Sequence, residues 1–182
     1  MKASFKVVAV VLALFVSFST LVSAASVNIA DLKVDTTKVT SSKELVKQSD
    51  VIVYGRFDSP LKDYPTSHMV NEKKLVNYVQ SFHARMALKG NTGALVRVLT
   101  TGVEPLPLPT DPLNKIYSGP IAEGEYVCFL KKVPGKNMYT LVGVWQGLYP
   151  VINQKTMALE EFGFSEFGDL TVQELYQKIK SC

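Results

Sequence analysis

The chain has 182 residues, of which 47% are hydrophobic, and a formal net charge of +4 at pH 7. A charge this small gives little reason to expect a nucleic acid or another polyanion as partner. Two histidines and two cysteines leave few ligands for a metal site, and the sequence lacks a glycine-rich phosphate-binding motif, so we expect no metal and no cofactor.

The first 24 residues have the features of a secretory signal peptide. Lys2 and Lys6 give a basic start, residues 7–16 form an apolar run, and the small residues at 22–24 suit cleavage. The run is too short to span a bilayer, which disfavours the alternative of an uncleaved membrane anchor. We therefore expect residues 1–24 to be removed, with no stable membrane insertion afterwards. The sequence predicts a secreted, extracellular protein and leaves open whether it stays at the cell wall.

The rest of the chain, about 158 residues, has a length suited to a single domain with a sizeable core. Residues 25–40 are polar, rich in threonine and only loosely patterned, which predicts an extended lead-in. Residues 41–182 then form one globular domain. Ser41 and Glu44 have the spacing of a capping box, so a helix of about two turns should begin there.

The middle of the chain contains three strand signals. Residues 51–58 are β-branched and aromatic and predict a strand, whereas the prolines and charges of 59–74 predict an exposed loop. Residues 78–88 alternate between apolar and polar side chains, as in a half-buried strand, and 94–102 predict another strand. Residues 104–123 contain five prolines, which predicts a long connection rather than a strand.

The second half predicts a hairpin, a short strand and a helix. Residues 125–133 and 138–145 flank a Pro-Gly-Lys-Asn turn, and 148–153 form a shorter edge strand. After an acidic, aromatic loop, Thr171 and Glu174 form a second capping box. This order predicts an α+β, mainly β fold: five to six antiparallel strands in a barrel or curled sheet, with a short N-terminal helix and a C-terminal helix.

The two cysteines predict a disulfide. Cys128 lies in a strand that we expect to be central, and Cys182 shares one face of the last helix with the apolar residues Val172, Leu175 and Ile179. Because a secreted protein meets an oxidising environment, we expect a Cys128–Cys182 bond that fixes the helix to the sheet. The alternative is two unrelated thiols, one buried and one at the terminus.

The single tryptophan suggests a binding surface. Trp145, Gln146 and Tyr149 fall around a Gly-centred turn, where exposed aromatic rings could anchor a protein or a sugar. The alternative is that Trp145 closes the end of the barrel as part of the core. The proline-rich segment 105–112 could also dock a groove, although a rigid surface connection is the simpler interpretation.

Catalytic and metal-binding arrangements are weakly indicated. His83 shares a strand face with Ser81 and could act as a base, but the sequence lacks a nucleophile elbow and the simpler interpretation is a solvated residue. The carboxylates between residues 160 and 169 could bind calcium, yet they lack the ligand spacing of a calcium loop. We therefore expect a protein that is not an enzyme.

The strand segments resemble a loosely defined set of small secreted proteins of Gram-positive, spore-forming bacteria. The matching segments are "SDVIVYGRF", "FHARMALKGN", "VRVLTTG", "GEYVCFLKK" and "YTLVGVWQGLYPV", within residues 45–152. The resemblance implies a five-stranded OB-like barrel, similar to tissue inhibitor of metalloproteinase and netrin-like modules. Those inhibitors use an N-terminal cysteine to bind the protease zinc, and the chain has none near Ala25. The resemblance therefore implies the fold and not the inhibitory residues.

These features together favour a secreted or cell-surface binding domain that recognises a protein or an envelope component without catalysis. A secreted inhibitor of a hydrolase, using the connection at 105–123 as its wedge, is the first alternative. A hydrolase that works through His83 is the second.

Overall fold

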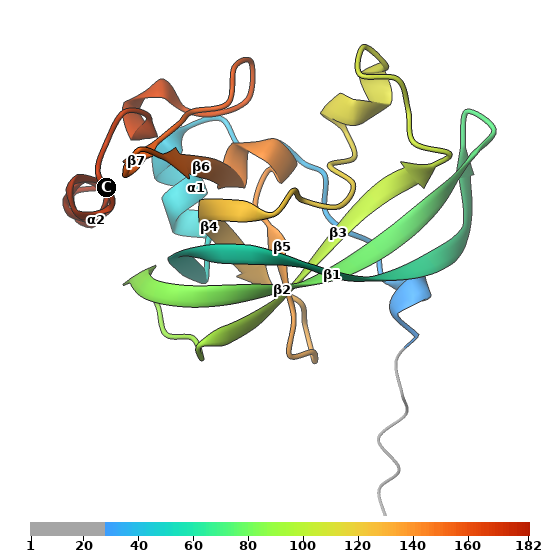
Figure 1. Ribbon diagram of the computed structural model, residues 1–182, viewed down its shortest axis with the longest axis horizontal. Coiled ribbons are helices and arrows are strands. Elements are labelled where there is room, and N and C mark those ends of the chain that lie inside the picture. The colour runs from blue at the N-terminus through green and yellow to red at the C-terminus, as the bar shows by residue number, and fades with distance from the viewer. Residues whose placement is uncertain (1–27) are drawn as a thin grey trace, which may run out of the picture.

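A computed structural model describes residues 28–182 (Figure 1). The predicted signal peptide at residues 1–24 lies outside the described residues. Among the described residues, no helix combines the length and the apolar character needed to cross a membrane.

The described chain contains strands, two α-helices and short 3-10 turns. The strands are β1 (Val51–Val70), β2 (Lys73–Lys89), β3 (Leu95–Glu104), β4 (Gly124–Lys132), β5 (Tyr139–Leu141), β6 (Leu148–Ile152) and β7 (Lys155–Thr156). The α-helices are α1 (Ser42–Gln48) and α2 (Val172–Lys180). The 3-10 turns are η1 (Ile29–Asp31), η2 (Pro112–Lys115), η3 (Val144–Gly147) and η4 (Ser165–Phe167).

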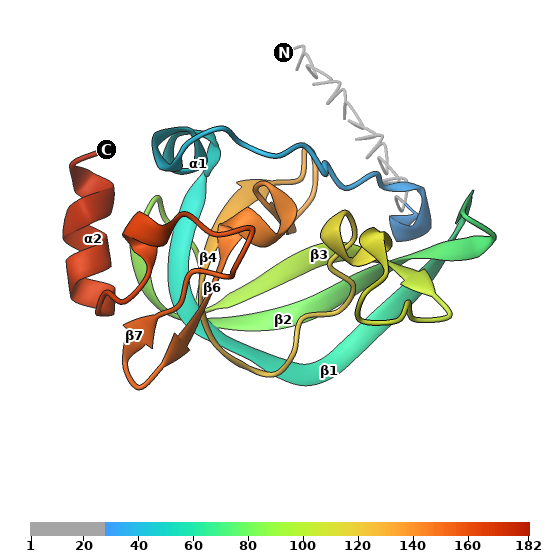
Figure 2. The ribbon, with the colours of Figure 1, turned by 90° about the horizontal axis from the view of Figure 1, so that it is seen from above.

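Five strands close into a barrel. The sheet order is β1-β2-β3-β5-β4, and β1 pairs with β4 to complete the ring. Every pairing in the ring is antiparallel except the short parallel contact of β3 with β5. This confirms the predicted α+β, mainly β class and its OB-like barrel, with one helix before the barrel strands and one after them (Figures 1 and 2).

The long β1–β2 hairpin differs from the prediction. Residues 59–74 were expected to form a loop, but β1 runs on to Val70 and pairs with β2 almost to the turn. The strand tolerates prolines here because β1 pairs with β4 only as far as Phe57. Beyond Phe57, the edge of β1 that faced β4 has no partner strand and needs no N–H donors. The pairing with β2 also shifts register between Phe57 and Leu61, the interval that contains Pro60.

Strand β4 separates two cores. Tyr126, Cys128 and Leu130 point into the barrel, where they pack with residues from the other four barrel strands. Val127 and Phe129 point outward and pack under α1, α2 and η4. Both sides of the strand are therefore buried, as its continuous apolar sequence predicts.

Both predicted helix starts are confirmed. The Thr171 hydroxyl accepts from the Glu174 N–H, and the Glu174 carboxylate accepts from the Thr171 N–H, at 3.2 and 2.8 Å. At α1, the Ser41 hydroxyl likewise accepts from the Glu44 N–H and caps the helix. The Glu44 carboxylate, however, accepts from the N–H of Thr40 instead of that of Ser41. Each helix then places its apolar face on the outer core, where Leu45 and Leu175 are fully buried.

The lead-in is fixed along the barrel by two side-chain amides. Gln146 accepts from the Val39 N–H at 2.8 Å and donates to the Val39 carbonyl at 3.0 Å. Asn77 donates to the carbonyls of Ile29 and Leu32 at 2.9 and 2.8 Å. The segment predicted to be extended is therefore hydrogen-bonded like an added edge, although its chain forms no strand among the described residues.

Candidate binding groove

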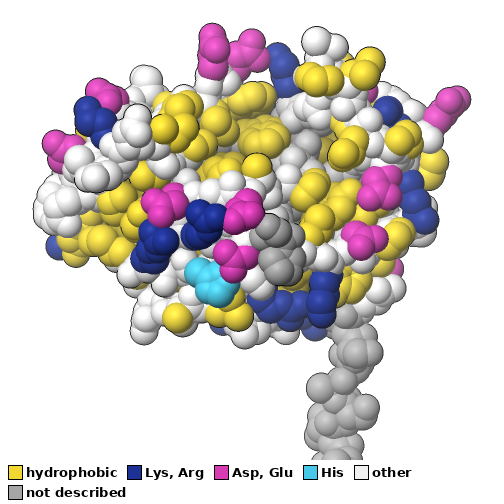
Figure 3. Space-filling view, viewed as in Figure 1, with side chains coloured by type: hydrophobic (Ala, Val, Ile, Leu, Met, Phe, Trp, Pro, Cys, Tyr) yellow, Lys and Arg dark blue, Asp and Glu magenta, His cyan; other side chains and the backbone are white. Residues whose placement is uncertain are grey.

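Three segments that are distant in sequence converge on one groove of about 580 Å³. One wall is formed by residues 109–115, which include η2, and the other by residues 159–162. Trp145 of η3 lies between the two walls. In Figure 3 the two loops project from the top of the molecule, with hydrophobic side chains below and between them.

The apolar part of the groove is an aromatic pair. The rings of Trp145 and Phe162 have their centroids 6.1 Å apart and are tilted by 41°. The indole N–H of Trp145 donates to the carbonyl of Asn114 at 2.6 Å. This bond ties Trp145 to the η2 wall and uses its only polar atom, so the ring offers a ligand its π surface.

The η2 wall is held by its own hydrogen bonds. The Asp111 carboxylate accepts from the Leu113 N–H at 2.9 Å and caps the turn. The Asn114 amide donates to the carbonyls of Leu108 and Pro109 at 2.7 and 3.2 Å. These bonds, together with the fixed φ of the prolines, pre-form this wall.

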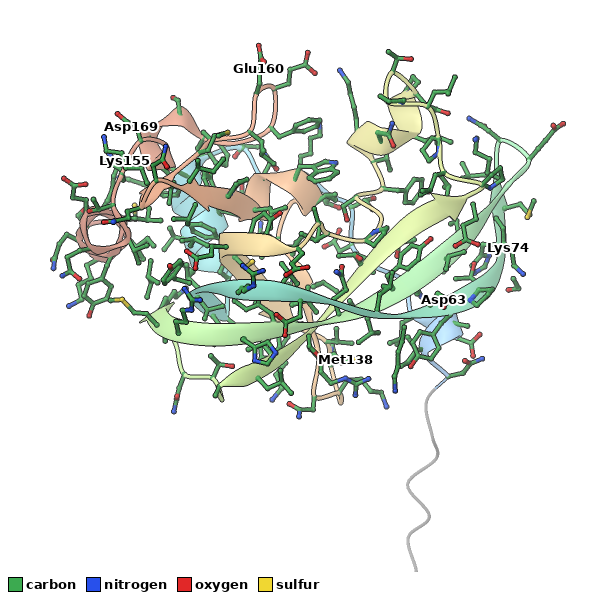
Figure 4. The ribbon with its side chains drawn as sticks, viewed as in Figure 1. Asp63, Lys74, Met138, Lys155, Glu160 and Asp169 are labelled. Carbon is green, nitrogen blue, oxygen red and sulfur yellow. The ribbon has the colours of Figure 1, made fainter. Side chains whose placement is uncertain are left out.

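A single ion pair joins the two walls. The ammonium of Lys115 lies 2.6 Å from the Glu161 carboxylate, and both side chains are more than half exposed. The hydrogen bond from Lys115 lowers the pKa of Glu161. Glu160, next to it, stands at the tip of the loop (Figure 4). Because solvent screens exposed ion pairs, the walls are only weakly tied.

The groove is more acidic than the protein as a whole. Its lining contains the carboxylates of Asp111, Glu160 and Glu161 and one cation, Lys115, which sum to −2. Residues 28–182 have 18 basic and 16 acidic side chains, a balance of +2, since the other two lysines precede residue 28. The lining of the groove therefore has the opposite sign to the net charge of the described chain.

Only one of the three residues predicted to form a binding surface lies in the groove. Trp145 is half-buried and lines it, but Gln146 is 8% exposed and bonds Val39. Tyr149 is fully buried, and its hydroxyl accepts from the N–H of Phe164 at 2.9 Å. The prediction of a shared surface is wrong because Tyr149 pairs with the outward-facing Val127, which places its ring under η4 and α2.

The predicted disulfide is also absent: Cys128 and Cys182 are both free. Leu175 and Ile179 dock as expected, but on the outer core, whereas Cys128 points into the barrel. The prediction assigned α2 to the wrong face of β4. The helix packs over Val127 and Phe129, the sequence neighbours of Cys128, whose side chains point to the opposite face. Burial raises the pKa of the Cys128 thiol well above its ordinary value, which makes it unreactive.

His83 lies in an exposed network of charges across β1, β2 and β4. Its Nε2 is 2.6 Å from an Asp58 carboxylate oxygen, and the histidine side chain is 53% exposed. Nearby, Arg85 pairs with Glu125, which also accepts from the Tyr54 hydroxyl. Hydrogen bonds from Tyr54 and Arg85 lower the pKa of Glu125. Figure 3 shows charges of both signs together on this face. The arrangement is typical of a solvated strand surface.

The acidic residues before the last helix do not form one cluster. Glu160 and Glu161 border the groove, whereas Asp169 pairs with Lys155 at 2.8 Å on the far side of the loop (Figure 4). Within residues 28–182, no group of three or more His, Cys, Asp or Glu side chains is arranged to hold a metal ion.

The groove was missed because its parts come from three segments that the sequence treats separately. Trp145, the proline-rich connection and the acidic, aromatic loop each have a recognisable pattern, yet nothing in the sequence shows that they meet.

Comparisons with protein-family models, with curated proteins and with solved structures return no match to this chain. The fold and the groove geometry are therefore the basis for any function assigned to it.

Proposed function

We propose that this protein is a secreted or cell-surface binding domain without catalysis, and that the groove is its binding site. The observation that supports this most is the convergence of Trp145, the η2 wall and residues 159–162 on one groove. The groove, of about 580 Å³, combines the aromatic pair of Trp145 and Phe162 with exposed carboxylates. The features of residues 1–24 support secretion.

The shape of the groove favours part of a large partner over a small enclosed molecule. The groove lies between two projecting loops and is open to solvent (Figure 3). Two leucines on the connection that leads into the η2 wall are also exposed, Leu106 at 69% and Leu108 at 74%. Exposed apolar side chains beside a groove are typical of surfaces that contact a protein or an envelope component.

The same leucines favour the alternative of a secreted hydrolase inhibitor. An inhibitor needs a rigid, exposed segment that can enter a cleft, and Leu106 and Leu108 alternate with prolines on such a segment. This alternative predicts that Leu106→Ala with Leu108→Ala abolishes a one-to-one complex with a secreted hydrolase. An OB-like module of the inhibitor or netrin kind, as the strand motifs suggest, is compatible with either function.

The experiment compares partner binding by the chain without residues 1–24 and by two aromatic variants. Partners from envelope and secreted fractions are identified, and the affinity of each is then measured with purified protein. Phe162→Ala should weaken a groove partner at least about tenfold. Tyr176→Ala, at a half-buried aromatic on α2, is the matched control and should leave affinity unchanged. Equal affinity of the wild type and Phe162→Ala for every partner would reject the groove as the site.

A further inference from the structure

We infer that the groove binds a cationic polypeptide segment, one that presents lysine or arginine side chains to the aromatic pair. This inference rests on the proposed function and names the chemistry of its ligand. Three properties of the groove support it: its charge, its ring surfaces and its hydrogen-bonding groups.

The charge of the groove selects against anions. Three carboxylates and one ammonium line it, and that ammonium, Lys115, is already paired with Glu161. A second lysine at its edge, Lys38, lies over the Phe162 ring and also lowers the pKa of Glu161, so carboxylates outnumber the cations by one when Lys38 is included. The described chain as a whole has a balance of +2, so the excess of carboxylates at the groove is local and attracts a cationic ligand there. Local complementarity of this kind directs a ligand to one site and limits non-specific attachment.

The ring surfaces suit a cation as well. Trp145 and Phe162 present aromatic faces, to which ammonium and guanidinium groups are attracted electrostatically. The protein already uses one of these rings in this way, because the ammonium of Lys38 lies 5.6 Å from the Phe162 centroid. A ligand cation would add a second such contact in the groove.

The hydrogen-bonding groups favour a ligand rich in donors. The indole N–H of Trp145 already donates to the backbone carbonyl of Asn114. The side-chain amide of Asn114 already donates to two carbonyls of its own wall. The carboxylates of Glu160 and Glu161 are hydrogen-bond acceptors, and Glu161 already accepts a hydrogen bond from the ammonium of Lys115. An ammonium or guanidinium of a ligand can satisfy such acceptors, whereas an acidic peptide would leave them facing its own carboxylates.

Lys115 acts in this account as an internal substitute for the ligand. Its ammonium bonds Glu161 across the mouth of the groove, where both side chains are exposed. Exposed pairs of this kind are weak, so an incoming lysine can replace Lys115 at little cost. The ligand would then interact with Glu160 and Glu161 and with the rings between the walls.

Trp145 is the only tryptophan of the chain, so its fluorescence reports directly on the groove. The probes are hexalysine amide, hexaglutamate and the neutral glycan chitohexaose, titrated at low ionic strength and checked by calorimetry. We expect hexalysine to change the fluorescence saturably and hexaglutamate to have no effect. Adding salt should weaken the hexalysine complex.

The decisive variant is Glu160→Gln with Glu161→Gln, because both side chains are exposed and the fold does not depend on them. It should weaken hexalysine about tenfold, the combined effect of two exposed charge interactions. Glu72→Gln with Glu166→Gln removes the same charge from exposed positions outside the groove and should leave affinity unchanged. Equal affinity of the two double variants would overturn the inference.

The remaining outcomes separate the inference from the proposed function. If chitohexaose changes the Trp145 signal and hexalysine does not, the cationic ligand is wrong and a glycan-binding groove remains. If no probe binds and no partner depends on Phe162, both the inference and the proposed function fail.

Discussion

Trp145 and Tyr149 are only four residues apart, yet they lie in two regions with different properties. Tyr149 is enclosed by Phe129 and Phe167, with ring centroids 5.5 and 5.9 Å away, and α2 and η4 complete that cover. Trp145 is flanked by two loops that an exposed ion pair joins. An aromatic residue near a turn is therefore a site only where the chain leaves it uncovered. The predictions below test whether one region provides stability and the other binding.

Phe129→Ala should have the largest effect, and on stability alone. The ring is fully buried and stacks on Phe167 at 5.5 Å with a 14° angle between planes. Its loss leaves a cavity and should lower the free energy of unfolding by about 3–5 kcal/mol. Urea denaturation measures this, with Glu160→Gln as a groove control that should stay within about 0.5 kcal/mol of the wild type. A comparable loss in both variants would mean that the two regions are not separate.

Gln146→Ala tests the other residue wrongly expected at the surface. The change leaves the buried N–H and carbonyl of Val39 without their partner, so it should cost about 2 kcal/mol of unfolding free energy. Gln173→Ala, on the exposed side of α2, makes the same side-chain change and should cost less than about 0.5 kcal/mol. If denaturation gives the two variants the same stability, the amide bonds do not hold the lead-in.

Lys115→Gln should improve binding without stabilising the fold. It frees Glu161 and makes the groove more acidic, so the affinity for hexalysine should rise about two- to fivefold at low salt. Fluorescence titration measures the change. Lys74→Gln alters the net charge equally on the exposed side of β2 and should have no effect (Figure 4). A weaker complex in Lys115→Gln would show that Lys115 contacts the ligand as a partner and not as a competitor.

Acid should weaken the complex in a defined pH window. Lys115 lowers the pKa of Glu161, so this carboxylate stays ionised at every pH above the usual glutamate value of about 4.3. Its interaction with a cation is therefore fully present above that pH and is lost as the pH falls through the lowered pKa. Hexalysine affinity should be constant from pH 7 to 5 and fall only as the pH drops below the usual glutamate value, through the lowered pKa of Glu161. The same acid titration of Glu161→Gln is the control, and an identical pH profile in the variant and the wild type would exclude this carboxylate.

The strands and helices of the barrel could be predicted because the patterns that indicate them lie among residues close together in the sequence. The alternation along residues 78–88 and the two helix caps, Ser41 and Thr171, each depend on neighbours in the chain and appear in the structure, although only Thr171 forms the full capping box. The long hairpin was missed because prolines indicate a loop unless one knows that β1 has a free outer edge beyond Phe57.

The tertiary features were harder to predict for a physical reason. The disulfide prediction was wrong because α2 packs on the side of β4 opposite Cys128. Both faces of β4 are buried and apolar, so the sequence does not indicate which face the helix covers. The groove depends on how residues 109–115 and 159–162 pack around Trp145, which no periodicity encodes. Its chemistry was visible only as separate aromatic and acidic residues.

The most direct test of the account maps the hexalysine contact by NMR on isotope-labelled protein. Backbone amide shifts compare the groove with the charged face around His83 and Asp58, which also offers carboxylates. If the groove is the binding site, the perturbations are confined to residues 109–115, Trp145 and 159–162. Shifts centred on Asp58, Glu123 and Glu125, with the groove unchanged, would contradict it and place the binding surface on the strand face.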